Sequence, residues 1–447
     1  MKVIIVGTGP AGLTAMRIAM EYNHNILLID QGPHFEPDYS ARNLSLKGFN
    51  QITGGIGGTC SIWAGQLIPL SERELSSGDY AHLFEADEYR KQVFEILKWF
   101  RIGKIQYSFI SLFSRIASKF ENPRFSLVTP FLNLESIFSP ELAKYALEPV
   151  RQKVKSLVFD GSRVTGLKLV SGRDIEVCSN DVLILAAGTM GNTKIILESF
   201  SGFSNSILGG NLADHPCGYV GTIFPRFKFG FFKKEVLYST LGNGIKLKYE
   251  LITEDTSGCF EIHPNKSNIR MRNLAAAYRE LGFLEFLAQF LIRLINIFCN
   301  KVTLIPFNIA DSAQIWIQFE QVNNQNSRID LQSGNFSYGW HLNSQDMENF
   351  NTLIELIIEQ LESRRRRFEI QKITSEEELN RWAQQANHPS GTLTRKLFEE
   401  SPDIAIDQKQ LLITGGALFP RASWVNPTLT IMAATAIGVR RLLKSDN

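Results

Sequence analysis

Six residues near the start of the chain, Gly7-Thr8-Gly9-Pro10-Ala11-Gly12, place glycine at the first, third and sixth positions. This spacing suits a pyrophosphate. Gly7 allows a tight turn, Gly9 lets the backbone approach the phosphates, and Gly12 lets a following helix pack closely. Asp30 stands 18 residues past Gly12, where a carboxylate can accept hydrogen bonds from a ribose hydroxyl. These residue types and spacings predict a dinucleotide site.

The elements around this motif are the ones that such a site requires. Residues 3–6 predict a buried strand, 13–20 an apolar helix and 26–29 a second buried strand. The helix amino terminus supplies free N–H groups and a dipole that favour a negative pyrophosphate. A plain glycine-rich turn is the weaker alternative because the motif stands in its required context. The motif alone does not distinguish FAD from NAD.

Composition narrows the classes of protein that fit. The chain has 447 residues, 44% of them hydrophobic and 21% charged, which is typical of a globular protein with two or three domains. The net charge of +2 gives no global field that would favour nucleic acid. Five cysteines are scattered and never spaced CxxC, which argues against a disulfide framework, a zinc site and a dithiol redox site. We expect no metal.

Targeting and membrane signals are weak. Residues 1–6 are too short for a signal peptide, and no run of 18 uncharged apolar residues is present. We therefore expect a cytoplasmic protein. Two lipophilic stretches, 94–120 and 281–299, are interpreted as buried cap helices. The alternative is a surface that contacts a lipophilic substrate or, peripherally, a membrane.

The rest of the chain alternates strands and helices. Residues 181–188 predict a buried strand, and a helix follows at 192–200. Alternation at 245–251 and an apolar run at 314–319 predict strands of an antiparallel sheet, and amphipathic helices are expected at 346–361 and 428–443. The chain is thus α/β, in part α+β.

Several separated segments resemble the glucose-methanol-choline (GMC) oxidoreductases. The 7–12 motif fits the FAD fingerprint of that family, and residues 54–65 are similar to a GGTS-x-x-WGG flavin segment of its bacterial branch. Further similar segments are Leu183-Ile184-Leu185-Ala186-Ala187-Gly188-Thr189, Ala213-Asp214-His215-Pro216, His388-Pro389-Ser390-Gly391-Thr392 and Asn426-Pro427-Thr428-Leu429-Thr430. The likeness keeps its order along the whole chain and is weakest in the centre.

The resemblance implies an architecture, a cofactor and a reaction. It implies a Rossmann-like FAD domain in three pieces (1–70, 146–220 and 381–447), a helical cap at 71–145 and an antiparallel-sheet substrate domain at 221–380. It also implies oxidation of a CH–OH group with FAD held non-covalently, because Ile62 replaces the histidine that links FAD in some members. The cofactor-binding residues would be Gly7, Gly9, Pro10, Ala11, Gly12, Asp30, Gly57, Gly58, Thr59, Cys60, Trp63, Ala64, Gly65, Ala187, Gly188, Asp214, Pro427 and Thr428.

Two residues match the family's catalytic positions. Of the seven histidines, His388 matches the catalytic base, and histidine suits that role because its pKa lies near working pH. Asn426 matches the position whose side chain holds the substrate oxygen. Asn426 before Pro427 also has the pattern of a helix N-cap. His215 is interpreted as structural, and Cys60 as a small buried cysteine rather than a thiol adduct site.

Three other interpretations compete. A disulfide reductase would need a second GxGxxG and a CxxC pair, which the sequence lacks. An NAD-dependent dehydrogenase would leave the segments at 183–189 and 388–392 without a role. A catalytically inactive or membrane-associated flavoprotein would not require His388 and Asn426. The substrate, an alcohol that is sugar-like or lipophilic, and the electron acceptor, such as oxygen or a quinone, stay open.

Overall fold

The computed structural model describes residues 1–32, 39–41, 54–61, 65–100, 123–128, 134–201, 207–224, 240–241, 245–264, 313–332, 335–401 and 404–444. The stretch 281–299, most of 94–120, and Ile62, Trp63 and Ala64 lie outside these residues. Within them, no helix is long and apolar enough to span a membrane. The expected location and membrane contact stay predictions.

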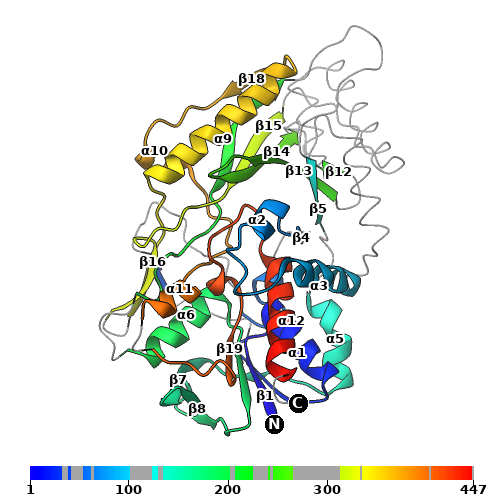
Figure 1. Ribbon diagram of the computed structural model, residues 1–447, viewed down its shortest axis with the longest axis vertical. Coiled ribbons are helices and arrows are strands. Elements are labelled where there is room, and N and C mark those ends of the chain that lie inside the picture. The colour runs from blue at the N-terminus through cyan, green and yellow to red at the C-terminus, as the bar shows by residue number, and fades with distance from the viewer. Residues whose placement is uncertain are drawn as a thin grey trace, which may run out of the picture.

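A parallel sheet forms the lower half of the molecule (Figure 1) and carries the glycine motif. Val3 on its central strand lies opposite Ile26 and Val182, all in parallel register. Apolar side chains are buried on both faces, as the continuous hydrophobic run at 3–6 predicts. The five strands, in order across the sheet, are β19 (Leu411–Ile413), β10 (Val182–Leu185), β1 (Lys2–Val6), β2 (Asn25–Asp30) and β6 (Val150–Arg151).

The alternation of side chains along β1 divides the core into two layers. Val3 and Ile5 pack with one group of helices, whereas Ile4 and Val6 face the opposite side. The first layer contains α1 (Pro10–Glu21), α3 (Ala86–Trp99), α5 (Leu134–Lys144) and α12 (Thr428–Lys444). The second contains α6 (Gly188–Ser199) and a small sheet of β7 (Val154–Asp160), β8 (Arg163–Leu169) and β9 (Asp174–Glu176).

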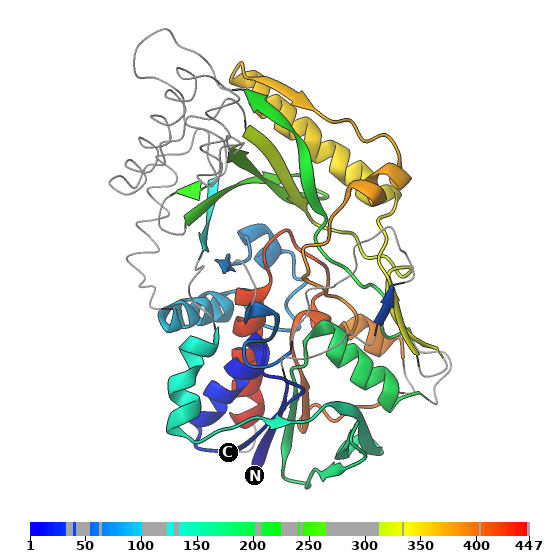
Figure 2. The same ribbon diagram turned by 180° about the vertical axis from the view of Figure 1, so that it is seen from behind.

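An antiparallel sheet forms the upper half, as predicted, and α9 (Ser344–Ser363) covers its outer face in both views (Figures 1 and 2). Phe260 and Ile317 pack against Leu353 of α9 in one apolar cluster. The opposite face of the same strands includes the buried polar side chains Lys248, Glu250, Glu261 and Gln318. The strands, in order, are β18 (Arg367–Ile370), β11 (Cys217–Phe224), β15 (Ala313–Phe319), β14 (Ser257–Pro264), β13 (Ile245–Ile252), β5 (Pro123–Val128) and β4 (Gln66–Leu67), with β12 (Thr240–Leu241) beside β13.

The antiparallel sheet extends beyond the range predicted for the substrate domain. β4 and β5 come from the ranges 1–70 and 71–145 and extend the sheet of the predicted substrate domain. The five ranges themselves stay a prediction. A second three-stranded sheet joins β3 (Tyr39–Ala41), β16 (Arg328–Gln332) and β17 (Asn335–Gly339). The short helices are α2 (Glu72–Ser76), α10 (Glu376–Trp382) and α11 (Arg395–Glu399).

The end of β15 ties the antiparallel sheet to the segment before α12. Gln318 Nε2 donates to the carbonyl of Trp424 at 2.6 Å, and the N–H of Gln321 donates to Ala422 at 3.2 Å. Arg421 lies 2.7 Å from the carboxylate of Glu320, which is 5% exposed. Ion pairs with little solvent access are screened less than surface pairs. These contacts place the approach to α12 beneath the sheet.

The close crossing of α1 over β1 gives a test of the glycine motif. A Cβ on Gly12 would lie 1.9 Å from the carbonyl oxygen of Gly7, whereas one on Gly9 would meet no atom within 4 Å. We expect Gly12→Ala to destabilise the apoprotein by about 2–3 kcal/mol through overpacking. Urea unfolding would measure the loss. Gly9→Ala is the control and should keep the wild-type midpoint, so equal midpoints for the two variants would contradict this packing.

Candidate active site

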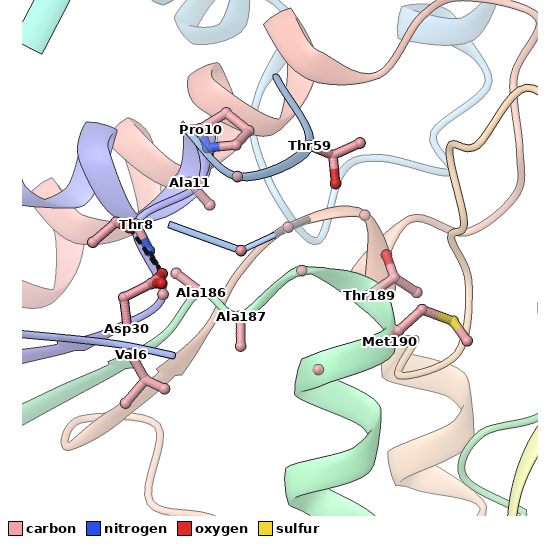
Figure 3. Close-up of a pocket in the computed structure, with 18 of the residues that line it drawn as sticks. Val6, Thr8, Pro10, Ala11, Asp30, Thr59, Ala186, Ala187, Thr189 and Met190 are labelled. Atoms are coloured by element: carbon pink, nitrogen blue, oxygen red, sulfur yellow. Dashed lines mark hydrogen bonds between the residues drawn. The ribbon is translucent and has the colours of Figure 1, made fainter. Parts of the chain in front are cut away.

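One cavity follows the carboxyl ends of β1, β2 and β10 and the starts of α1, α6 and α12. The carboxyl ends of parallel strands share one edge of a sheet, which is why segments far apart in sequence meet here. Figure 3 shows Thr8 and Asp30 on one side of this site and Thr189 at the start of α6 on the other. The expected residues that line the cavity are Gly7, Gly9, Pro10, Ala11, Asp30, Gly58, Thr59, Cys60, Ala187, Gly188, His388, Pro427 and Thr428.

Other expected residues lie behind this lining. Gly12 packs against Gly7, and the N–H of Gly57 donates to the carbonyl of Thr8 at 2.8 Å. The remaining three, Gly65, Asp214 and Asn426, are also absent from the lining, although Pro427 next to Asn426 is part of it. Trp63 and Ala64 lie outside the described residues.

The cavity also contains residues that the sequence analysis did not identify, including Thr8, Gln152, Lys153, Lys194, Gly415 and Gly416. The Gly415-Gly416 pair carried a usable signal, because two glycines directly after a buried strand indicate a tight turn at the strand end. Lys153 and Lys194 gave no such signal. Each is a single charged residue, and both line one cavity only because β7 and α6 pack together.

The Asp30 carboxylate joins two glycine-rich loops. Oδ2 accepts from the backbone N–H and the hydroxyl of Thr8, at 2.9 and 2.8 Å. Oδ1 accepts from the N–H groups of Gly32 and Gly55, both at 2.8 Å. A carboxylate has about four lone-pair sites, so these bonds use its acceptor capacity. Asp30 thus orders the cavity wall, and its bond to a ribose hydroxyl stays a prediction.

The start of α1 fits a pyrophosphate. Gly9 is the N-cap and makes no side-chain cap bond, and Pro10 occupies the first turn. No acidic side chain stands in that turn, and Pro10 and Ala11 of the turn line the cavity, so the positive end of the helix dipole favours an anion there. The empty space beside the Cα of Gly9 allows the backbone to approach a ligand closely.

Cys60 behaves as a buried cysteine. Its Sγ lies 3.8 Å from the Thr428 hydroxyl, and burial raises the pKa of the thiol to about 12 despite that hydrogen bond. The thiolate is the nucleophilic form, so this thiol is a poor candidate for an adduct at neutral pH.

His388 lies in the cavity wall, on a loop fixed by Asp214. The N–H of His388 donates to Asp214 Oδ2 at 3.3 Å, and its ring Nδ1 lies 2.6 Å from Nε2 of His215. Burial, followed by the positive charge of Lys248, lowers the pKa of His388 to about 4. The ring is therefore neutral at pH 7, which is the form that can accept a proton.

Asp214 and His215 form the support behind His388. His215 is 2% exposed, and its Nδ1 lies 2.6 Å from the carbonyl of Ser423. Burial raises the pKa of the Asp214 carboxyl to about 7, although backbone N–H groups, including that of His388, favour its ionised form. The potential ligand atoms of Asp214, His215 and His388 lie within 4.8 Å of one another. Hydrogen bonds within the protein already involve the Asp214 carboxylate, both ring nitrogens of His215 and Nδ1 of His388.

Asn426 does not act as a helix cap here. The helix α12 begins at Thr428, and the N–H of Ile431 donates to the carbonyl of Pro427 at 2.8 Å. The buried Oδ1 of Asn426 has no hydrogen-bond partner among the described residues. A buried amide oxygen without a partner costs about 1–3 kcal/mol, so this atom is suited to a ligand.

Comparison with known proteins supports the architecture. No protein-family model and no curated protein matches the sequence. Pyridoxine 4-oxidase from Mesorbium loti matches the fold with a TM-score of 0.56 and 12% identity, over 98% of both chains. An FAD-dependent oxidoreductase from Chaetomium thermophilum gives 0.58 and 12% over 99% of both chains. Formate oxidase from Aspergillus oryzae RIB40 gives 0.55 and 13% over 100% of this chain and 98% of its own. The chain therefore has the fold of these three proteins.

The pyrophosphate fit gives a second test. Gly9→Ala should lower the content of bound dinucleotide at least about tenfold, because a methyl group there occupies the space for phosphate without disturbing the apoprotein. The measurement is the absorbance of nucleotide released by denaturation, per mole of purified protein. A variant purified with full nucleotide content would remove Gly9 from the binding site.

Proposed function

We propose that this protein is an FAD-dependent oxidoreductase of the GMC type that oxidises the CH–OH group of an alcohol to a carbonyl. The observation that carries this proposal is the position of His388. It lines the same cavity as Gly7 and Gly9, although the segments are more than 370 residues apart. A neutral imidazole beside a dinucleotide cradle fits oxidation of an alcohol better than simple nucleotide storage.

The residues present fit FAD. The glycine loop and the start of α1 would hold the pyrophosphate, and the starts of α6 and α12 line the remaining cavity. When bound there, FAD supplies the acceptor for the carbinol hydride. The amino terminus of α12, with Thr428 in its first turn, would favour negative charge near it. The match in fold with an FAD-dependent oxidoreductase, and with a formate oxidase in which FAD modification is described, supports the same cofactor.

Two side chains act on the hydroxyl group of the substrate. His388 takes the hydroxyl proton of the alcohol, because its ring is neutral at pH 7 and can accept a proton. Asn426 holds the substrate oxygen by donating from its amide Nδ2, because an oxygen that loses its proton needs a hydrogen-bond donor. The substrate is a small-molecule alcohol, and the electrons leave to oxygen, a quinone or another carrier.

Two measurements test this function. The cofactor released from purified protein should be FAD. NAD would favour an NAD-dependent dehydrogenase, and the absence of any nucleotide would favour a catalytically inactive protein. The holoprotein should then be mixed without oxygen with a panel of primary, secondary, sugar-like and lipophilic alcohols. Bleaching of the flavin by one class identifies the substrate, and recolouring in air identifies an oxidase. A bound flavin that no alcohol reduces would contradict the proposal.

His388→Ala should retain FAD but slow flavin reduction by alcohol about 10²–10⁴-fold, the usual contribution of a general base. Stopped-flow absorbance under anaerobic conditions measures the rate. His82→Ala is a matched control, because His82 lies on the surface and bonds to the carbonyls of Asp79 and Leu418. An unchanged rate in His388→Ala would exclude the residue as base.

The pH dependence follows from the pKa of His388. Because this pKa is lowered to about 4, the ring is neutral above that value and protonated below it. The rate of flavin reduction should therefore be flat between about pH 6 and 8 and should fall as pH decreases towards 4. An acid limb centred near the unperturbed value of about 6.5 would show that the ring is solvated in the enzyme.

A further inference from the structure

The hydrogen bonds of the His215 ring define which of its two nitrogens carries the proton. Its Nδ1 lies 2.6 Å from the backbone carbonyl of Ser423, and a carbonyl oxygen can only accept a hydrogen bond. Nδ1 of His215 therefore carries the proton. Burial lowers the pKa of His215 well below its usual value, so the ring is neutral and Nε2 keeps its lone pair.

That lone pair determines the tautomer of His388. Nδ1 of His388 lies 2.6 Å from Nε2 of His215, and the rings meet edge to face at 69°. Because the Nε2 of His215 is the acceptor, Nδ1 of His388 must donate. A neutral imidazole has a single N–H group. The only ring nitrogen of His388 that can accept a proton is therefore Nε2.

Backbone contacts around the two histidines hold their rings in this relative position. Asp214 accepts from the N–H of His215 at 2.8 Å and from that of His388 at 3.3 Å. Ala213 and Ser390 exchange backbone hydrogen bonds in an isolated antiparallel bridge. The two chain segments are 173 residues apart, and these bonds leave little freedom for one ring to move relative to the other.

We propose that His215 is a positioning residue for the oxidation. It accepts the Nδ1–H of His388, leaves Nε2 of His388 as the proton acceptor, and stabilises the imidazolium that forms when the alcohol proton arrives. This inference rests on the proposed function, in which His388 is the base. No proton needs to leave the pair during the step: the alcohol O–H bond breaks and the Nε2–H bond of His388 forms.

Among the described residues, two charged groups act on the pair. Asp214 lies against both backbones, and Lys248, paired with Glu261 at 3.1 Å, acts on both rings. The positive charge of Lys248 and burial oppose a second proton on the pair, so the dyad takes up one proton at a time. Loss of the His215 acceptor would destabilise the imidazolium and lower the pKa of His388 further.

The first experiment needs no substrate. Holoprotein labelled with ¹⁵N-histidine is examined by NMR at pH 7, and the His388 signals are identified by their loss in His388→Ala. We expect a protonated Nδ1 and a bare Nε2 in the wild type. His215→Leu should give a mixture of tautomers, and His341→Gln, which changes a histidine not hydrogen-bonded through its ring to His388, should not. A protonated Nε2 in the wild type would overturn the proposal, even if His215→Leu does not fold.

The second experiment uses the alcohol that bleaches the flavin in the panel. We expect His215→Leu to slow flavin reduction about 10- to 100-fold, part of the contribution of a general base, and to move the acid limb to lower pH. His215→Gln, whose amide oxygen can replace Nε2 as acceptor, should recover most of the rate. In a His388→Ala background, His215→Leu should cause no further loss, because residues that act as a unit are not additive.

The outcomes separate the two proposals. If no alcohol reduces the bound flavin, the proposed function fails, whatever the tautomer. If His388→Ala reduces the flavin as fast as wild type, the role of His388 as base fails, and the role of His215 fails with it. If His388→Ala is slow but His215→Leu keeps the wild-type rate and pH profile, only the role of His215 fails. A loss of FAD or of folding stability without a change in the pH profile indicates a structural residue. One equivalent of bound metal, lost in His215→Leu, would instead make Asp214, His215 and His388 a metal site and overturn the inference.

Discussion

The cavity depends on one buried carboxylate. Asp30 stands at the end of β2 and binds the N–H groups of three loop segments, at Thr8, Gly32 and Gly55. A buried charge is tolerated only where hydrogen bonds replace its hydration. Each of these bonds therefore fixes a loop relative to the parallel sheet. Without the Asp30 carboxylate, no shared hydrogen-bond acceptor would hold the glycine loop and the segment at 54–58 together, and the wall of the cavity would lose its shape.

A second set of contacts holds the segment near the other end of the chain, which forms the second half of the site. The end of β15 holds residues 421–424 through Gln318, Glu320 and Gln321. Those residues lead directly to Asn426 and the start of α12, which packs in the same apolar layer as α1. The antiparallel sheet thus positions the second half of the site while its other face is occupied by α9.

The two halves meet in a chain of hydrogen bonds with a fixed direction. It begins at the carbonyl of Ser423, passes through His215 and ends at His388. The direction follows from the carbonyl, which has no proton to donate. Burial keeps both rings neutral, so the arrangement combines a defined tautomer with a vacant basic nitrogen. A solvent-exposed histidine would have neither property.

The sequence by itself determined the local elements. The glycine spacing and the run at 3–6 predict β1, the loop and α1, and alternation predicts β13, because these features depend on neighbouring residues only. Resemblance to known motifs indicated His388, which the cavity contains, and Asn426, which lies beside it. The contacts between distant segments were decided only by tertiary structure. Three such features are the bond of Asp30 to Gly55, the presence of Lys153 and Lys194 in the lining of one cavity, and the pairing of His215 with His388. They depend on how separate strands and helices pack, and no local pattern encodes that distance.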